Sequence, residues 1–130
     1  MRLSELFREV EFDGSIKNDA DINLVTDDSR LVRPGSLFVC IRHRSFDGHT
    51  AALDALASGA AAVVTQDRLG LENELHVADS RSAYARLCAA LCNHPERRLR
   101  MIGVTGTNGK TTVTTLIRNI LSDSGTKTLL

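Results

Sequence analysis

The residues with the most definite chemistry stand in the run from Gly103 to Thr112, which reads Gly-Val-Thr-Gly-Thr-Asn-Gly-Lys-Thr-Thr. Glycines let the backbone curl so that successive N–H groups face one anion, and the start of a following helix adds partial positive charge. Lys110 can reach the terminal phosphates of a nucleotide, and the Thr111 hydroxyl can ligate Mg²⁺. We therefore predict a phosphate loop with Lys110 as its catalytic residue. The predicted nucleotide-binding residues are Gly106, Thr107, Asn108, Gly109, Lys110, Thr111 and Thr112.

This loop departs from the general phosphate-loop pattern at one position. The pattern GxxxxGK[ST] requires a glycine where this sequence has Val104, and glycines stand at 103 and 106 instead. The alternative is a glycine-rich turn that binds no nucleotide. The flanking segments favour the phosphate loop, because an apolar run over 101–105 precedes it and a helical pattern over 110–122 follows it.

A second group of polar side chains, Asp28-Ser29-Arg30, follows the apolar segment 22–26. Ser29 offers a hydroxyl beside the end of an expected strand, where it can hydrogen-bond the polar edge of a ligand. Arg30 can pair with a phosphate or with a local carboxylate. The alternative is an ion pair between Asp28 and Arg30 that only fixes the turn.

A third group of candidates lies in the polar segment from Arg44 to His49. Phe46 can supply an apolar face to a ring, with Arg44 and Ser45 beside it. The tripeptide that follows, residues 47–49, is open to two interpretations. It belongs either to a binding loop or to a plain loop that leads into a helix N-terminus.

The cysteines, Cys40, Cys88 and Cys92, are odd in number in a chain without an export signal, which argues against a disulfide framework. Cys88 and Cys92 lie on one face of an expected helix and His94 follows, so a metal site is one interpretation. Zinc sites usually need four ligands in tighter pairs. We therefore favour the other interpretation, in which both cysteines are small apolar residues of a helix core.

Apolar runs alternate with helical patterns along the chain, which is typical of an α/β fold. A turn is expected over 33–36, where proline presets φ and glycine tolerates the left-handed region. Ser80 is the expected N-cap of one helix, and Gly59 and Gly125 are expected helix stops. The expected helices are 2–9, 50–58, 81–92 and 110–122, and the expected strands are 22–26, 37–41, 61–65, 75–78, 101–105 and one beginning at 126.

The polar segment 95–98 is expected to be a linker between two domains. Residues 1–96 would form a small α/β domain. Residues 97–130 contain only a strand, the phosphate loop, a helix and the beginning of another strand, whereas a parallel sheet needs several strands covered by helices on both faces. We therefore expect 97–130 to be the incomplete opening of a parallel-sheet ATP-binding domain.

The composition excludes several classes of protein. With 42% hydrophobic residues and balanced charge, 16 basic and 16 acidic side chains, the chain is not a disordered segment. The basic residues of 98–130 suit an anionic ligand but are too sparse, and too poor in aromatic neighbours, to indicate nucleic acid. No apolar run approaches the ~18 residues of a membrane span, and the N-terminus does not fit a secretory signal. A cytoplasmic protein is expected.

The loop 105–112 after a Gly-Val strand resembles that of the Mur ligase family, whose members build the peptide stem of bacterial peptidoglycan. Folylpolyglutamate and cyanophycin synthetases have similar loops. The front of the chain favours the Mur ligases, because residues 28–30 together with 34–39 resemble the Asp-Ser-Arg…Pro-Gly-x-Leu-Phe-Val signature of the UDP-binding domain of the E and F types. Phe-Asp-Gly-His at 46–49 and Gly-Ala at 59–60 are similar to further family motifs, so the resemblance covers nearly the whole chain.

The phosphate loop is more similar to the E type, since F types more often have serine at position 107. The resemblance implies ATP-dependent amide ligation with Mg²⁺. ATP phosphorylates the D-glutamyl γ-carboxylate of UDP-N-acetylmuramoyl-L-alanyl-D-glutamate, and the amine of a diamino acid then displaces phosphate from the acyl phosphate. The resemblance also implies that the uridine end of this substrate contacts Ser29, Arg30, Arg44, Ser45 and Phe46.

The family has three domains, and this chain resembles the first and the start of the second. We therefore expect a monomeric fragment that is inactive alone, and a missing domain that binds meso-diaminopimelate or L-lysine. The alternatives are an F-type fragment and a non-catalytic UDP-sugar-binding module. His43 stands where the family usually has glycine; if that position requires positive φ, His43 costs about 1 kcal/mol of strain.

Overall fold

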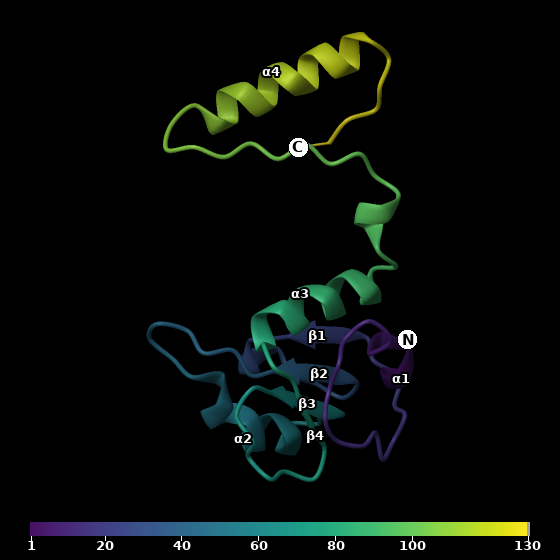
Figure 1. The fold of residues 1–130 in the computed structure, drawn as a ribbon, viewed down its shortest axis with the longest axis vertical. Helices are drawn as coiled ribbons and strands as arrows, with labels where there is room; N and C mark the ends of the chain where they lie inside the picture. Colours follow the sequence, from purple (N-terminus) through teal and green to yellow (C-terminus); the bar gives the residue numbers. More distant parts are fainter. Residues whose placement is uncertain (130) are drawn as a thin grey trace. The chain divides into compact units, whose positions relative to one another are not determined.

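The computed structural model describes residues 1–129, which divide into two compact units, Met1–Arg98 and a second that begins at Leu99. The first unit contains a parallel sheet whose strands follow one another in chain order (Figure 1). All three neighbouring pairs are parallel. The predicted α/β fold class is therefore confirmed. The strands are β1 (Leu24–Thr26), β2 (Ser36–Val39), β3 (Ala62–Thr65) and β4 (Glu74–His76).

Helices cover both faces of this sheet, so its central strands β2 and β3 are buried along their whole length. Successive side chains of a strand point to opposite faces. Leu37 and Val39 pack into the cluster that includes residues of α1 (Leu3–Leu6) and α3 (Ser80–Leu91). Phe38 packs into the cluster beneath α2 (Ala52–Ala57). Burial on both sides explains why these strands appear in the sequence as continuous apolar runs.

The predicted turn over 33–36 leads directly into β2. The Ser36 N–H donates to the Arg33 carbonyl at 2.9 Å, which closes the turn. Gly35 has a φ of +83°, and a Cβ there would lie 2.7 Å from the Asn23 side-chain nitrogen. Both the conformation and the close approach require glycine.

Helix α3 begins differently from the prediction that Ser80 caps it. The cap is Asp79, whose carboxylate accepts from the N–H groups of Arg81 and Ser82 at 2.9 and 3.2 Å. Ser80 is the first helical residue and is buried. Aspartate is as good a cap as serine, and its carboxylate also suits the positive end of the helix.

The segment predicted to be a linker belongs to the first unit. Pro95–Arg97 forms a 3₁₀ turn, η3. Arg97 ties this turn to the front of the chain, because its guanidinium lies 2.6 Å from a carboxylate oxygen of Glu9. The hydrogen bonds from Arg97 lower the pKa of Glu9. The segment is therefore a fixed turn, and the division between the two units falls directly after it.

The second unit contains one helix, α4 (Lys110–Asp123), and its predicted stop at Gly125, where φ is +82°. The strands predicted over 101–105 and from 126 are absent through residue 129; residue 130 lies outside the described residues. Met101 and Ile102 are 73% and 59% exposed. A strand is stabilised by hydrogen bonds to a neighbouring strand, and residues 99–129 contain no strand that could pair with either segment.

None of the helices formed by residues 1–129 has both the length and the apolar character that a bilayer crossing requires.

Candidate substrate and nucleotide sites

The loops that follow the four strands meet at the carboxyl edge of the sheet. In open α/β sheets this edge is where ligands bind, because loops from several strands converge there. It consists of η1 (Ser29–Leu31) after β1 and of the loops 40–47 after β2, 66–73 after β3 and 77–79 after β4.

Polar contacts join these loops to one another. His43 Nε2 lies 3.2 Å from a carboxylate oxygen of Asp27, which links the loops after β2 and β1. The Arg42 guanidinium pairs with Asp67 in the loop after β3. Arg81, in the first turn of α3, donates to the Arg42 carbonyl at 2.6 Å. The carboxyl edge of the first unit is therefore one connected polar surface.

Ser29 and Arg30, both predicted to contact substrate, lie on this edge in η1. Arg30 is held by Asp28, whose carboxylate accepts from the Arg30 backbone N–H at 3.0 Å and from its guanidinium at 2.6 Å. These hydrogen bonds lower the pKa of Asp28 to about 2. The ion pair that fixes the turn is therefore present, and the remaining Arg30 N–H groups are exposed.

Arg44, Ser45 and Phe46, the other predicted substrate residues, lie in a tight hairpin after β2. Arg42 pairs with Asp47 in an antiparallel bridge, and the His43 N–H donates to the Phe46 carbonyl at 2.8 Å. This closure leaves the tip exposed, and Phe46 is 46% exposed.

The strain considered for His43 does not arise. In the described chain, the residues other than glycine with positive φ are Asn93 and His94, at the end of α3. The backbone at His43 therefore does not need glycine, and the histidine costs no left-handed conformation there.

Asp47, Gly48 and His49 form the structural base of the hairpin. Asp47 caps η2 (Gly48–Ala51) by accepting from the His49 N–H at 3.0 Å. Its carboxylate also lies 2.6 Å from His49 Nδ1 and accepts from Arg42 Nε at 3.0 Å, and these bonds hold the pKa of Asp47 well below its usual range. A Cβ on Gly48 would lie 2.8 Å from the nitrogen of Ile41, so only glycine fits.

Sequence reasoning missed Gln66, Asp67 and Arg81 as members of this edge. Arg81 and Gln66 line a cleft of about 440 Å³, together with Arg42, Ala78, Asp79 and Ser80. The available signal was the position of these polar residues directly after the apolar strands over 61–65 and 75–78. What the sequence did not reveal is which loops touch.

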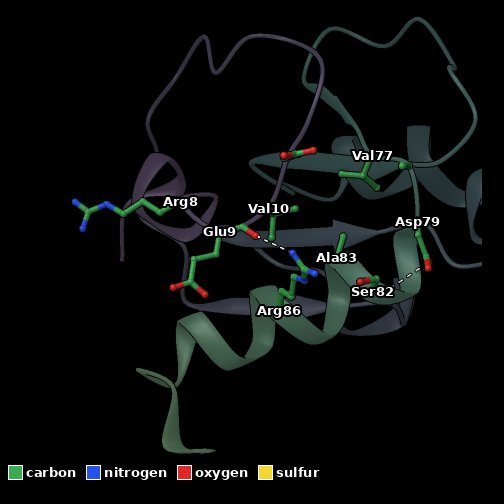
Figure 2. Close-up of a pocket in the computed structure, with 10 residues that line it drawn as sticks. Arg8, Glu9, Val10, Val77, Asp79, Ser82, Ala83 and Arg86 are labelled. Carbon is green, nitrogen blue, oxygen red and sulfur yellow. Dashed lines mark hydrogen bonds between the residues drawn. The ribbon is translucent and has the colours of Figure 1, made fainter. Parts of the chain in front are cut away.

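A second hollow, of about 420 Å³, lies between the segment after α1 and helix α3 (Figure 2). The Arg86 guanidinium donates to the Glu9 carbonyl across it at 3.2 Å. Its lining mixes acidic, basic and apolar side chains, and none of the predicted site residues is among them.

The cysteine prediction was half right. Cys88 packs against the core cluster on the α3 side of the sheet, as expected of a small apolar residue. Cys92 is exposed beyond the end of α3, so it is no part of that core.

The phosphate loop leads into α4 with the geometry of an anion site. Gly106 and Gly109 have φ of +151° and +76°, and Gly109 is the N-cap, with no side chain bound to the first N–H groups of the helix. Lys110 Nζ donates to the Gly106 carbonyl at 2.6 Å, which places the ammonium group over the loop. Free N–H groups at the start of a 14-residue helix and an adjacent ammonium group fit a phosphate.

Comparison with known proteins matches most of the first unit to a protein family. The family described as "Mur ligase family, catalytic domain" matches residues 21–98, which include the whole sheet and its carboxyl edge. The chain belongs to the Mur ligase family.

Curated relatives of this Mur ligase chain match across its whole length. It is 41% identical over 136 residues to the UDP-N-acetylmuramoyl-L-alanyl-D-glutamate--2,6-diaminopimelate ligase of Syntrophomonas wolfei, covering 100% of this chain and 27% of the relative. It is 38% identical to the UDP-N-acetylmuramyl-tripeptide synthetase of Deinococcus radiodurans, covering 98% of this chain and 28% of the relative. The chain therefore spans about a quarter of the length of the curated relatives it matches.

Solved structures of Mur ligases share the fold. A UDP-N-acetylmuramoyl-L-alanyl-D-glutamate--2,6-diaminopimelate ligase matches with a TM-score of 0.71 and 30% identity, over 96% of this chain and 26% of that one. MurF from Acinetobacter baumannii matches with a TM-score of 0.70 and 26% identity, over 92% and 27%. MurF from Thermotoga maritima, solved with ADP, matches with a TM-score of 0.57 and 28% identity, over 76% and 23%.

Proposed function

We propose that this chain is the front part of an E-type Mur ligase, an ATP-dependent enzyme that adds a diamino acid to UDP-N-acetylmuramoyl-L-alanyl-D-glutamate. The observation that carries the proposal is a match of 41% identity over the entire chain to a ligase of that name. The match includes both the carboxyl edge of the sheet and the phosphate loop. Residues 1–96 would be the UDP-substrate domain, and 97–130 the start of the ATP-binding domain.

In this proposal the carboxyl edge of the first unit binds the uridine end of the substrate. Ser29 supplies a hydroxyl to a uracil or ribose edge, and Phe46 supplies an apolar face to the base. Arg30 keeps exposed N–H groups for the diphosphate while Asp28 orients its guanidinium. Arg44 and Ser45, at the exposed tip of the hairpin, complete the contacts.

The phosphate loop binds ATP in this proposal. The backbone N–H groups of residues 106–112 would surround the phosphates, Lys110 would neutralise the terminal ones, and the Thr111 hydroxyl would hold Mg²⁺. Mg²⁺, when bound, would offset phosphate charge. Transfer of the γ-phosphoryl group of ATP to the D-glutamyl γ-carboxylate would release ADP and give an acyl phosphate. The amine of the incoming amino acid would then displace phosphate and lose a proton to form the amide. The fit of the loop to an anion and the ADP complex of a related ligase support this assignment.

The incoming amino acid is 2,6-diaminopimelate in the proposal, because the Syntrophomonas and Listeria relatives are named for it. L-Lysine is the alternative. Its binding site would lie in the part of the relatives that this chain does not span. We place the enzyme in the cytoplasm as a monomer, and we expect residues 1–130 alone to be inactive.

An F-type ligase is the second candidate, because MurF structures match the fold almost as well as the E-type structure does. F-type enzymes act on the UDP-linked tripeptide rather than the dipeptide. The higher sequence identity to E-type relatives favours the first candidate.

Calorimetric titration of the 130-residue chain tests the proposal. We expect UDP-N-acetylmuramoyl-L-alanyl-D-glutamate to bind, and Ser29→Ala to weaken it by about tenfold, the worth of one hydrogen bond. Lys110→Ala is the matched control, because Lys110 lies in the other unit and its loss should leave this affinity unchanged. Little binding of ATP·Mg²⁺ is expected, because residues 97–130 are only the start of the ATP-binding domain. Preference for the UDP-tripeptide would favour the F type, and absence of UDP-ligand binding by a folded chain would contradict the substrate assignment.

A further inference from the structure

His49 lies beneath the hairpin after β2 and joins two loops of the carboxyl edge. Its side chain is only 7% exposed. Nδ1 lies 2.6 Å from the Asp47 carboxylate, on the loop after β2. Nε2 accepts from the backbone N–H groups of Gln66 and Asp67, at 3.1 and 3.3 Å, on the loop after β3.

These partners fix the protonation state of the ring. A backbone N–H can only donate, so Nε2 must carry a lone pair to accept from Gln66 and Asp67. The carboxylate of Asp47 accepts, so the proton lies on Nδ1 and is donated to it. The arrangement therefore requires the neutral ring with its proton on Nδ1, because a second proton on Nε2 would point a donor at the N–H donors of Gln66 and Asp67.

We call Asp47, His49 and the two N–H groups of Gln66 and Asp67 the clamp. It is connected to the predicted substrate residues. Asp47 closes the hairpin by accepting from Arg42, and Arg42 pairs with Asp67 on the same loop that His49 holds. Residues 44–46 form the tip of this hairpin. The position of the tip therefore depends on whether both ends of the clamp are engaged.

We propose that neutral His49 is a positioning residue: by tying the hairpin after β2 to the loop after β3, it holds Arg44, Ser45 and Phe46 in place for the UDP end of the substrate. This inference rests on the proposed function. His49 is buried under the hairpin and acts through Asp47 and Arg42 rather than by touching the ligand. Its protonation at low pH should release the loop after β3 and weaken binding.

Several charged groups surround the clamp and must be separated from His49 in a pH experiment. Asp47 and Arg42 face it from the hairpin, Asp67 from the loop after β3, and Arg81 from α3. Two other histidines touch the same loops, His43 against Asp27 and His76 against the Gln66 carbonyl. Histidine is the side chain that ordinarily changes charge between about pH 5 and 8, so these two are the necessary controls.

The test is the affinity of the 130-residue chain for UDP-N-acetylmuramoyl-L-alanyl-D-glutamate, measured calorimetrically from pH 5 to 8. The diphosphate of this probe is esterified at both ends, so its charge is constant over that range. The variants are His49→Ala and His49→Asn, where Asn keeps a donor near the Nδ1 position but offers nothing to Gln66 and Asp67. The controls are His43→Gln and His76→Gln, and thermal unfolding checks that each variant is folded.

We expect wild-type affinity to fall as the pH falls, and His49→Ala to bind about tenfold more weakly at pH 8 with no such fall, the scale of one to two hydrogen bonds. His49→Asn should recover part of the affinity at pH 8 and remain independent of pH, while His43→Gln and His76→Gln keep the wild-type profile. If the role of His49 were purely structural, its loss would lower the unfolding temperature, but the affinity of the wild-type chain would not depend on pH through His49.

Three results would overturn the inference. If folded His49 variants bind as wild type does at pH 8, His49 positions nothing and the proposed function stands. If the His49 variants do not fold, two other results decide against His49. One is a wild-type affinity that is constant with pH, and the other is a pH dependence that is lost in His43→Gln or His76→Gln. If the folded wild-type chain does not bind the probe at all, the proposed function fails and the inference with it.

Discussion

The two units of the chain contain the same kind of sequence, an apolar run followed by a polar loop and a helix, yet within residues 1–129 only the first forms strands. In the first unit, Phe38 and Val63 are completely buried between helices and beside neighbouring strands. In the second, Met101 is 73% exposed and Ile120, on α4, is 68% exposed. The difference shows that an apolar run indicates only that a segment is to be buried. Whether the segment forms a strand depends on a neighbouring strand with which it can pair.

The two units also hold their candidate sites by different means. The carboxyl edge of the first unit is fixed by side chains from several loops, including Asp47, His49 and Arg42. The phosphate loop of the second is shaped by contacts within one short segment, namely the positive φ of Gly106 and Gly109, the start of α4, and the bond from Lys110 to the Gly106 carbonyl. A site made by local geometry can form before its sheet does, and a site made by converging loops cannot.

The largest expected effect comes from removing a core side chain of the first unit. Leu87 on α3 is completely buried, and Leu87→Ala should lower the free energy of unfolding by about 2–5 kcal/mol. Denaturant unfolding followed by circular dichroism measures this. Leu116→Ala on α4 is the matched control, because Leu116 is 57% exposed and its loss should change stability by less than about 0.5 kcal/mol. Equal effects would mean that α4 is buried in solution and that the contrast between the units is wrong.

A smaller loss of stability is expected where a side chain added to a glycine would clash with the backbone. Gly48→Ala should lower the free energy of unfolding by about 1–3 kcal/mol, since the new Cβ would lie 2.8 Å from the Ile41 nitrogen. Gly103→Ala is the control, because nothing lies within 4 Å of its Cβ position and its φ is not positive. The same denaturant titration compares the two variants, and a neutral Gly48→Ala would contradict the packing of the hairpin against the end of β2.

The smallest of the stability effects depends on pH. The pKa of Asp47 is lowered in the folded chain, chiefly by its bonds to His49, so its ionised form contributes stability that is complete above the ordinary carboxyl pKa of 3.8. That contribution is lost as the pH falls from about 4 towards the lowered pKa. Asp47→Asn should therefore cost about 1 kcal/mol at neutral pH and progressively less in acid.

Asp123→Asn, at the end of α4, is the control for this experiment, because Asp123 lies in the other unit. Unfolding temperatures measured from pH 7 to pH 2 show the difference between each variant and wild type. A destabilisation by Asp47→Asn that is constant over this range would show that the carboxylate charge does not stabilise the hairpin.

Much of the fold could be predicted from the sequence because its signals are local. The apolar runs over 37–41 and 61–65 are buried on both sides, and the Pro-Gly turn before β2 has its own conformational requirement. The helix over 110–122 has strong apolar periodicity and a glycine stop. The membership in the Mur ligase family followed from ordered motifs at the front and the phosphate loop, and the comparisons confirm it.

The parts that could not be predicted depend on contacts between distant residues. Nothing near Arg97 in the sequence indicates that it pairs with Glu9, so the sequence did not show that the segment before the unit boundary is a fixed turn. The position of His49 between two loops depends on the register of β2 and β3, which brings Gln66 and Asp67 to its ring. The substrate roles of Ser29, Arg30 and residues 44–46 remain predictions.

The most direct test of the account is to map UDP-N-acetylmuramoyl-L-alanyl-D-glutamate onto the isotope-labelled 130-residue chain by amide NMR at pH 8. The account predicts that the largest shift changes fall on residues 28–31 and 42–47 at the carboxyl edge, with small changes along α4. Changes centred instead on the hollow between Glu9 and Arg86, or spread evenly over the chain, would contradict it.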